Sequence, residues 1–255
     1  MIKIRGIKLE HYLTTLPLHL APVLCVFFAA YLQAVTGFGL VIVAAPLLMF
    51  FYDPKLVIPV MILLASCGNV SQTLLLHRDI HWRIIGFLIL GAILGQPIGF
   101  QIFSLVPSHY LKILISVVVL LSLSIMQLRH QHIRECRRNT LITGMLAGIM
   151  ATTTGMAGPP VAIYFAYTTM TIKELRATSI GFFFLSNMVS LTTFLVGGVD
   201  MAPAFNEFIY LLPGLIGGIV LGQLTFRFLP VPLLKKVIFG LMYFTCFYTI
   251  YTVIR

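Results

Sequence analysis

Two short breaks interrupt long apolar runs in this chain, and their central glycines, Gly37 and Gly155, lie 118 positions apart. The first break, Thr36 to Gly39, divides the run from Leu16 to Tyr52, and the second, Thr152 to Pro160, divides the run from Leu141 to Met170. In hydrocarbon, a broken helix is tolerated only where protein or a polar cavity satisfies the freed backbone groups. We therefore expect both breaks to line a ligand site. The alternative is that their glycines only let helices pack closely.

The composition excludes a soluble domain. Apolar residues make up 59% of the chain and charged residues 9%, and the mean hydropathy is +1.02, which leaves too little polar surface. The 17 Lys and Arg residues exceed the seven Asp and Glu residues, but they lie in short runs between apolar segments. Such runs are typical of membrane topology signals rather than of a nucleic-acid surface. We expect a multi-pass protein in a lipid bilayer, with no nucleic-acid partner.

Processing and metal signals are weak. Lys3, Arg5 and Lys8 precede the first apolar run without a small-residue cleavage site after it, so we expect this segment to be retained. The four cysteines form no CxxC pair and have no zinc spacing. His77 and His81 have the spacing of helical metal ligands, but no third ligand lies near them in the sequence. We expect no metal, cofactor or disulfide.

The chain divides into two membrane repeats of four apolar segments each. Residues 1–15 form an N-terminal tail, residues 16–128 the first repeat, residues 129–140 a basic linker and residues 141–255 the second repeat. After each broken stretch come three spans. These are Leu56–Leu76, Ile84–Val106 and Tyr110–Leu128 in the first repeat, and Ala177–Val199, Phe208–Phe226 and Val237–Ile254 in the second.

Matched residues support the duplication. Asn69 matches Asn187 at the same offset of 118, and three glycines spaced by four match three others at an offset of 123. The glycines are Gly91, Gly95 and Gly99, matched by Gly214, Gly218 and Gly222. Agreement at so many positions of special chemistry indicates an internal repeat. The prediction is an all-α polytopic protein with eight apolar segments and about ten helices.

Two topologies fit this pattern. If each broken stretch crosses once, the halves are parallel; if each forms a hairpin, the second half is inverted. With a cytoplasmic linker, inversion keeps 11 of the 17 basic residues inside, whereas the parallel arrangement keeps 10 and exports Lys235 and Lys236. We favour inverted repeats, although this arrangement places Lys3, Arg5 and Lys8 outside.

The candidate site contains neutral donors. We place every acidic residue in a tail or loop: Glu10, Asp53, Asp79, Glu135, Glu174, Asp200 and Glu207. A cation carrier usually needs a buried carboxylate, so this pattern favours an anion or a neutral solute. Hydroxyls, amides and the backbone N–H groups after the two glycine breaks can bind an anion. The predicted substrate-binding residues are Gln33, Thr36, Gly37, Gly39, Asn69, Thr154, Gly155, Gly158 and Asn187. For the two asparagines, the alternative is structural bonding between helices.

Other functional classes fit less well. An intramembrane enzyme needs a nucleophile with a base at depth, and no His or Asp lies there, so we expect no catalytic residue. An anion channel is the nearer alternative, because the same site would serve it. The chain has no ATP-binding motif, which leaves an ion or substrate gradient as the driving force.

The residues around the breaks also resemble a known family. Gln33 to Gly39 followed by Pro46, together with Gly144, Gly148, Gly155 and Gly158-Pro159-Pro160, are similar to the duplicated motif of the TauE/SafE family of sulfite exporters. The resemblance covers about residues 20 to 254. It implies an inner-membrane permease, a secondary transporter for a small anion such as sulfite, a sulfonate or sulfoacetate. It leaves open which anion is carried, the direction of transport, the coupling ion and the oligomeric state.

Overall fold

The computed structural model describes residues 9–36, 40–127, 136–165, 168 and 170–225, and five single residues near the C-terminus. These residues form nine α-helices and no strand. In chain order the helices are α1 (Leu9–Thr36), α2 (Leu40–Leu48), α3 (Pro54–Leu76), α4 (Trp82–Leu105), α5 (Ser108–Gln127), α6 (Arg137–Thr154), α7 (Gly158–Phe165), α8 (Ile172–Val196) and α9 (Ala202–Thr225). Most of the linker and of the expected span Val237–Ile254 lies outside the described residues.

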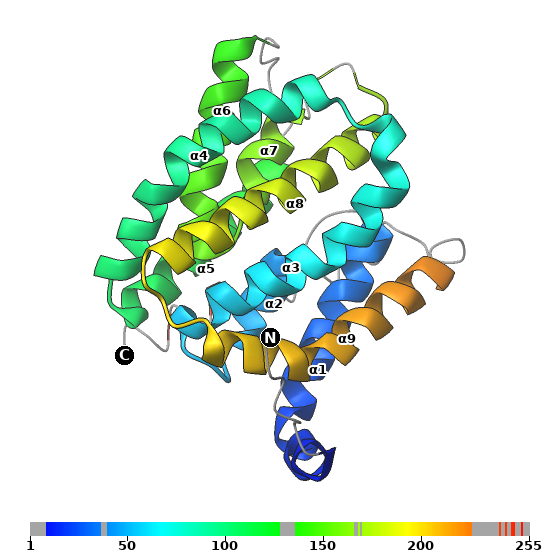
Figure 1. Ribbon diagram of the computed structural model, residues 1–255, viewed down its shortest axis with the longest axis vertical. Helices are drawn as coiled ribbons and strands as arrows, with labels where there is room; N and C mark the ends of the chain where they lie inside the picture. The colour runs from blue at the N-terminus through cyan, green and yellow to red at the C-terminus, as the bar shows by residue number, and fades with distance from the viewer. Residues whose placement is uncertain are drawn as a thin grey trace, which may run out of the picture.

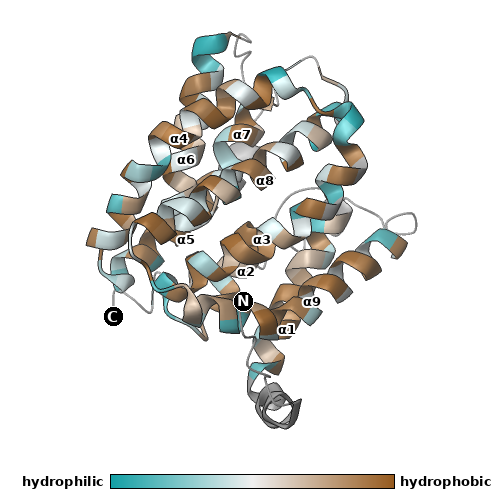
Figure 2. Ribbon diagram, in the orientation of Figure 1, coloured by the Kyte–Doolittle hydropathy of each residue, from teal (hydrophilic) through white to brown (hydrophobic). Residues whose placement is uncertain are grey.

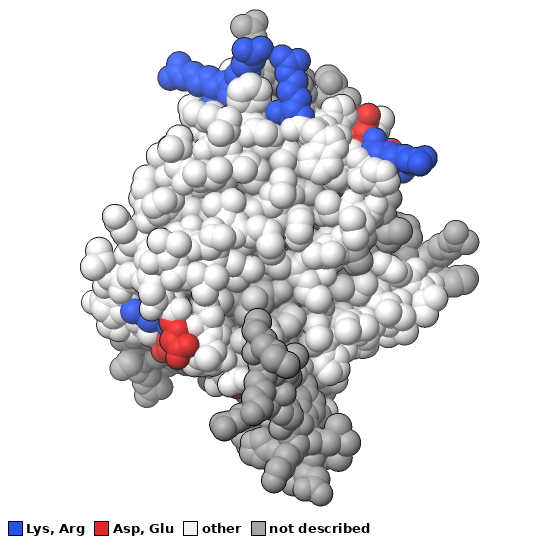
Figure 3. Space-filling model, viewed as in Figure 1, with Lys and Arg blue, Asp and Glu red and all other residues white. Residues whose placement is uncertain are grey.

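Several of the helices have the length and composition of membrane spans. Within the described residues, four of them are long and apolar enough to cross a bilayer: α3, α4, α8 and α9. Figure 2 shows apolar residues along most of the length of these helices. On the face drawn in Figure 3, the charged side chains gather toward two ends and leave an uncharged belt between them. The prediction of an all-α membrane protein is confirmed at this level.

Both broken stretches fold back on themselves. α6 ends at Thr154, and Gly155 follows in the left-handed region at φ 76°, a conformation that favours glycine. The Tyr164 hydroxyl near the end of α7 lies 2.7 Å from Thr140 Oγ1 near the start of α6. In the first half, the Tyr52 hydroxyl just after α2 lies 3.1 Å from Nδ1 of His19 on α1. Each break therefore produces a helical hairpin.

The helix that follows each hairpin starts with a side-chain cap. The Asp53 carboxylate accepts a hydrogen bond of 2.8 Å from the Lys55 N–H at the start of α3. Thr171 and Glu174 form a reciprocal capping box at the start of α8. Asp53 and Thr171 are 118 positions apart, so the repeat extends to the caps. The expected loop position of Glu174 is wrong, because this residue lies in the first turn of α8.

Each half of the chain packs one helix against the first helix of the other half. The glycines of α4 face α6, where a Cβ atom at Gly95 would overlap the Met145 carbonyl oxygen. The glycines of α9 face α1, where a Cβ atom at Gly218 would overlap the Phe27 carbonyl oxygen. The third apolar segment of each repeat thus packs against the first helix of the other repeat. Small residues allow this close backbone approach.

Ring contacts at matched positions join the same two pairs of helices. The Arg137 guanidinium lies 5.8 Å from the centre of the Phe87 ring, which joins the starts of α6 and α4. The His19 ring stacks on the Tyr210 ring at 4.5 Å and joins α1 to α9. His19 matches Arg137 at an offset of 118, and Phe87 matches Tyr210 at 123. The duplication is therefore visible in the packing as well as in the sequence.

Helices α3 and α8 lie side by side at the centre and run antiparallel (Figure 1). Just after the end of α3, the His81 N–H donates to Thr178 Oγ1 near the start of α8 at 3.1 Å. An ion pair of 3.0 Å between Asp79 and Lys173 lies at the same end. These two helices occupy matching positions in the two repeats, and the candidate site lies where they meet the hairpins.

Candidate functional site

A cavity of about 50 Å³ lies where the two hairpins meet α3 and α8. Its lining residues are Gln33, Leu40, Val41, Ile42, Ala65, Asn69, Gly155, Met156, Ala157, Gly158, Phe183 and Asn187. One water needs about 10–15 Å³ of such space, so the cavity holds about three to five waters. An anion of four or five heavy atoms occupies a similar space.

The cavity brings together five of the nine residues predicted from the sequence: Gln33, Asn69, Gly155, Gly158 and Asn187. Gly37, Gly39 and the side chain of Thr36 lie outside the described part of the chain. Thr154 does not line the cavity, because its hydroxyl donates to the Met150 carbonyl of its own helix at 2.8 Å. We therefore drop Thr154 from the proposed set of ligand donors.

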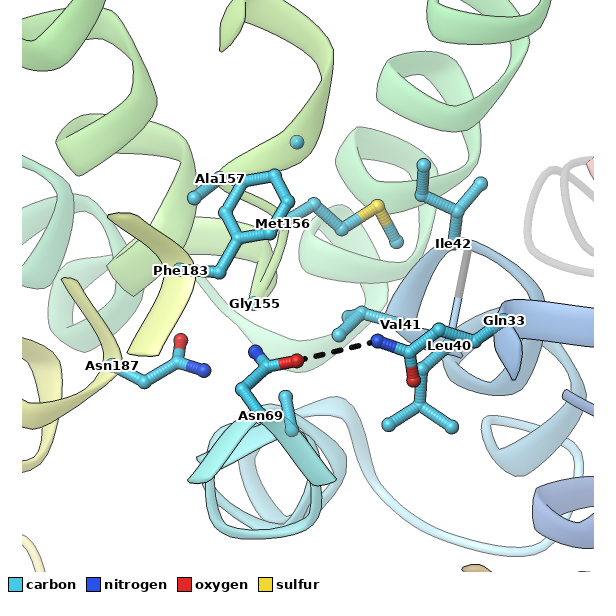
Figure 4. A pocket seen from close by; sticks show the side chains of 12 residues that line it. Gln33, Leu40, Val41, Ile42, Asn69, Gly155, Met156, Ala157, Phe183 and Asn187 are labelled. Carbon is cyan, nitrogen blue, oxygen red and sulfur yellow. Dashed lines mark hydrogen bonds between the residues drawn. The ribbon is translucent and has the colours of Figure 1, made fainter. Parts of the chain in front are cut away.

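Three amide side chains supply the polar surface of the cavity. Asn69 on α3 and Asn187 on α8 are 2% and 6% exposed, and Figure 4 shows their amides on neighbouring walls. Gln33 on α1 donates from Nε2 to Asn69 Oδ1 at 3.4 Å. Its Oε1 atom is buried and has no hydrogen-bond partner among the described residues. Position 151, which matches Gln33 in the second repeat, is an alanine, so Gln33 has no amide counterpart in that repeat.

The second break offers fewer backbone donors than the sequence suggested. The Gly155 N–H donates to the Ala151 carbonyl at 3.0 Å, and the Met156 N–H donates to the Met150 carbonyl at 3.3 Å. Pro159 and Pro160, in the first turn of α7, have no N–H group. Ala157 and Gly158 also line the cavity, and among the described residues their N–H groups have no backbone hydrogen bond to a turn or loop acceptor.

An apolar wall completes the cavity, and the sequence analysis did not identify it. Leu40, Val41 and Ile42 come from the first turn of α2, and Phe183 comes from α8. Phe183 and Ala65 lie one helical turn before Asn187 and Asn69, and they match each other at an offset of 118. The repeat itself was therefore the signal that could have found them.

Several polar residues near the cavity do not line it but form hydrogen bonds between helices. Thr152 and Thr153 on α6 donate to the carbonyl oxygens of Gln96 and Gly99 on α4 at 2.9 and 3.0 Å. The Gln96 amide donates in turn to the Ser186 carbonyl on α8 at 2.9 Å. These bonds fix α4, α6 and α8 relative to one another. They give the second hairpin a rigid support.

A second polar cluster lies away from the cavity, where α1 meets the start of α9. Nδ1 of His19 lies 3.4 Å from the Glu207 carboxylate and 3.1 Å from the Tyr52 hydroxyl. Burial and a hydrogen bond to Glu207 raise the pKa of Tyr52, so its phenol stays neutral. The expected loop position of Glu207 is wrong, because α9 begins at Ala202 and Glu207 lies in its second turn. No Asp, Glu, Lys, Arg or His lines the cavity within the described residues.

The fold and the site together define a class of protein: a multi-pass membrane protein with a small central cavity lined by amides, backbone and apolar side chains. A model of the sulfite exporter TauE/SafE family matches residues 23–249, and the chain belongs to this family. The resemblance noted in the sequence is thereby confirmed, and membership makes the protein a membrane transporter for anions. No curated protein and no solved structure matches the chain.

Proposed function

We propose that the protein is a secondary transporter for a small sulfur-containing or organic anion, such as sulfite, a sulfonate or sulfoacetate. It works in the inner membrane by alternating access, and the central cavity is its binding site. One observation carries this proposal. Asn69 and Asn187, at matching positions of the two repeats, converge on one cavity that both broken helices help to line. We propose no enzymatic activity.

Neutral donors can bind an anion weakly in such a cavity. Removing an ion from water costs several kcal/mol even after the protein relaxes, and one helix N-terminus returns at most about 2 kcal/mol. Each hydrogen bond to a charged group contributes about 1.5–3 kcal/mol. The amides of Asn69 and Asn187 and the N–H groups of Ala157 and Gly158 supply four donor groups around the cavity. Their sum roughly offsets the cost, which suits a substrate that must also leave.

We also propose that the repeats 16–128 and 141–255 are inverted about a cytoplasmic linker at 129–140. Three features support this: the hairpins return to their starting side, α3 and α8 run antiparallel, and Arg137 of α6 and Lys173 of α8 both lie near the start of α4. Arg137 at the start of α6 contacts Phe87 near the start of α4, and the start of α8 contacts the turn before α4. Parallel repeats would separate the starts of α6 and α8 across the membrane. Cytoplasmic loops carry an excess of Lys and Arg, which supports assigning this end to the cytoplasmic side.

Counterflow in liposomes tests whether the protein is a carrier. Vesicles containing the purified protein are loaded with unlabelled sulfite or methanesulfonate and diluted into trace labelled substrate. A carrier gives saturable uptake and transient accumulation of label above equilibrium. The reason is that each unlabelled substrate that leaves the vesicle turns the site outward, where it binds labelled substrate. Flux that rises linearly with concentration and shows no counterflow would instead establish a channel.

A further inference from the structure

Among the described residues, the central cavity presents only uncharged groups to its ligand. Its described lining consists of three amides, backbone and apolar side chains, and residues 37–39 between the first two helices are Gly, Phe and Gly. The cost of removing an ion from water grows with the square of its charge, so a second charge raises this cost about fourfold. The attraction to neutral donors grows only in proportion to the charge. Such a site favours singly charged ligands over doubly charged ones.

Gln33 adds an acceptor that nothing in the described protein satisfies. The side chain is 8% exposed, its Nε2 atom donates to Asn69, and Oε1 has no partner there. A buried acceptor without a donor is unfavourable. A fully ionised oxyanion has only lone pairs and cannot supply that donor. An oxyanion that keeps one O–H group can.

We propose that the cavity takes a singly charged oxyanion and that, for sulfite, the bound species is hydrogen sulfite. The ligand's O–H donates to Gln33 Oε1, and its charged oxygens accept hydrogen bonds from the amides of Asn69 and Asn187. This inference rests on the proposed function and narrows the substrate class of the same site. It places the sulfite dianion and the sulfoacetate dianion outside the favoured class.

Sulfite uptake measured across its second ionisation tests the charge selection at constant substrate size. The protein is reconstituted at full length in liposomes, and KM is measured from mildly acidic to mildly alkaline buffer. Methanesulfonate stays singly charged throughout and serves as the reference. We expect KM expressed as total sulfite to rise by about tenfold for each pH unit above that ionisation, while KM for methanesulfonate stays constant.

A Gln33→Leu variant tests the acceptor. We expect KM for hydrogen sulfite to rise about tenfold or more, and KM for methanesulfonate, which has no O–H, to change less than about threefold. Asn187→Leu is the matched comparison and raises both values. Gln33→Met is measured beside Gln33→Leu, so that a packing fault in one variant is recognised by the other.

The outcomes separate this inference from the function on which it rests. A sulfite KM that is constant or falls with pH overturns the charge selection, and so does a parallel change for both substrates, which reports titration of the protein. If Gln33→Leu raises KM equally for both substrates, the proposed hydrogen bond from the ligand's O–H to Gln33 is excluded. Gln33 then serves only to support Asn69. Transport of neither substrate by the unmodified protein overturns the proposed function itself.

Discussion

Asn69 and Asn187 lie at matching positions of two repeats, yet they line the same cavity from antiparallel helices. A two-fold relationship places equivalent residues together only near its axis, so the proposed inverted arrangement puts the cavity close to that axis. The packing of α4 on α6 and of α9 on α1 fits the same arrangement. In an alternating-access protein, a site on this axis can be exposed to either side by equivalent movements of the two repeats.

The two asparagines give the first prediction. Asn69→Leu and Asn187→Leu keep roughly the same volume but remove donors, so each should weaken transport by about 1–3 kcal/mol, or about 5- to 150-fold in KM. Gln223→Leu on α9 is the control, because its side chain is exposed and lies outside the cavity. KM in liposomes, at matched protein levels, measures the effect. Wild-type KM in both variants would show that the amides only bond helices together.

The glycines of α4 give a prediction about stability. Gly95→Ala places a Cβ atom against the Met145 carbonyl oxygen, and overpacking of this kind costs about 1–3 kcal/mol. Gly86→Ala in the same helix meets nothing within 4 Å. Because Ala is the better helix former, Gly86→Ala should be neutral or stabilising by up to about 1 kcal/mol. Thermal unfolding in detergent measures the effect. We expect the midpoint of Gly95→Ala to lie below that of the wild type, and the midpoint of Gly86→Ala not to fall. Equal midpoints would contradict the close packing of α4 on α6.

The repeat made much of this site predictable from the sequence. Gly155, Asn69 and Asn187 were found because each recurs at an offset of 118 within apolar runs, and Gly158 was found because it lies in the second break. The resemblance to the family came from the two glycine breaks with Gly144 and Gly148, and the family model confirms it. The inverted arrangement stays a proposal.

Other features depended on local geometry that spacing does not encode. The Thr154 hydroxyl has a carbonyl of its own helix within reach, and the N–H groups of Gly155 and Met156 are used to end α6. The position of Glu207 was missed because α9 starts close to Pro203, a residue that the first turn of a helix tolerates. The wall residue Phe183 was missed because a run of three phenylalanines has no periodicity.

The second break gives a prediction that separates folding from binding. Gly155 has φ 76°, so Gly155→Ala should destabilise the protein by about 1–2 kcal/mol through backbone strain. Gly158 has no such φ, and a Cβ atom there would lie 3.9 Å from Ile42 and Phe183 at ordinary contact distance. Gly158→Ala should therefore keep the wild-type midpoint of unfolding but narrow the cavity and raise KM, more for methanesulfonate than for sulfite. If Gly158→Ala lowers the midpoint as much as Gly155→Ala, the role assigned to Gly158 is structural.

Lys55 and Lys173 provide a matched pair for testing the topology. They lie 118 positions apart, both are exposed, and each follows the cap of its helix. Inverted repeats place them on opposite sides of the membrane, whereas parallel repeats place them on the same side. The measurement uses Lys55→Cys and Lys173→Cys in a background where the four native cysteines are replaced by serine. A membrane-impermeant thiol reagent is applied to intact cells.

We expect the reagent to label the cysteine at position 55 directly and the cysteine at position 173 only after the membrane is opened, because we propose that the linker end is cytoplasmic. A reporter fused after Arg255 gives an independent reading, since inversion also places the C-terminus outside. At this outside position, a fluorescent protein that is bright only in the cytoplasm should stay dark, and a reporter enzyme that is active only in the periplasm should be active. Labelling of both cysteines from the same side would exclude inversion and restore parallel halves. It would leave the cavity and its amides in place, but the equivalent movements proposed for the two repeats would no longer open it to opposite sides.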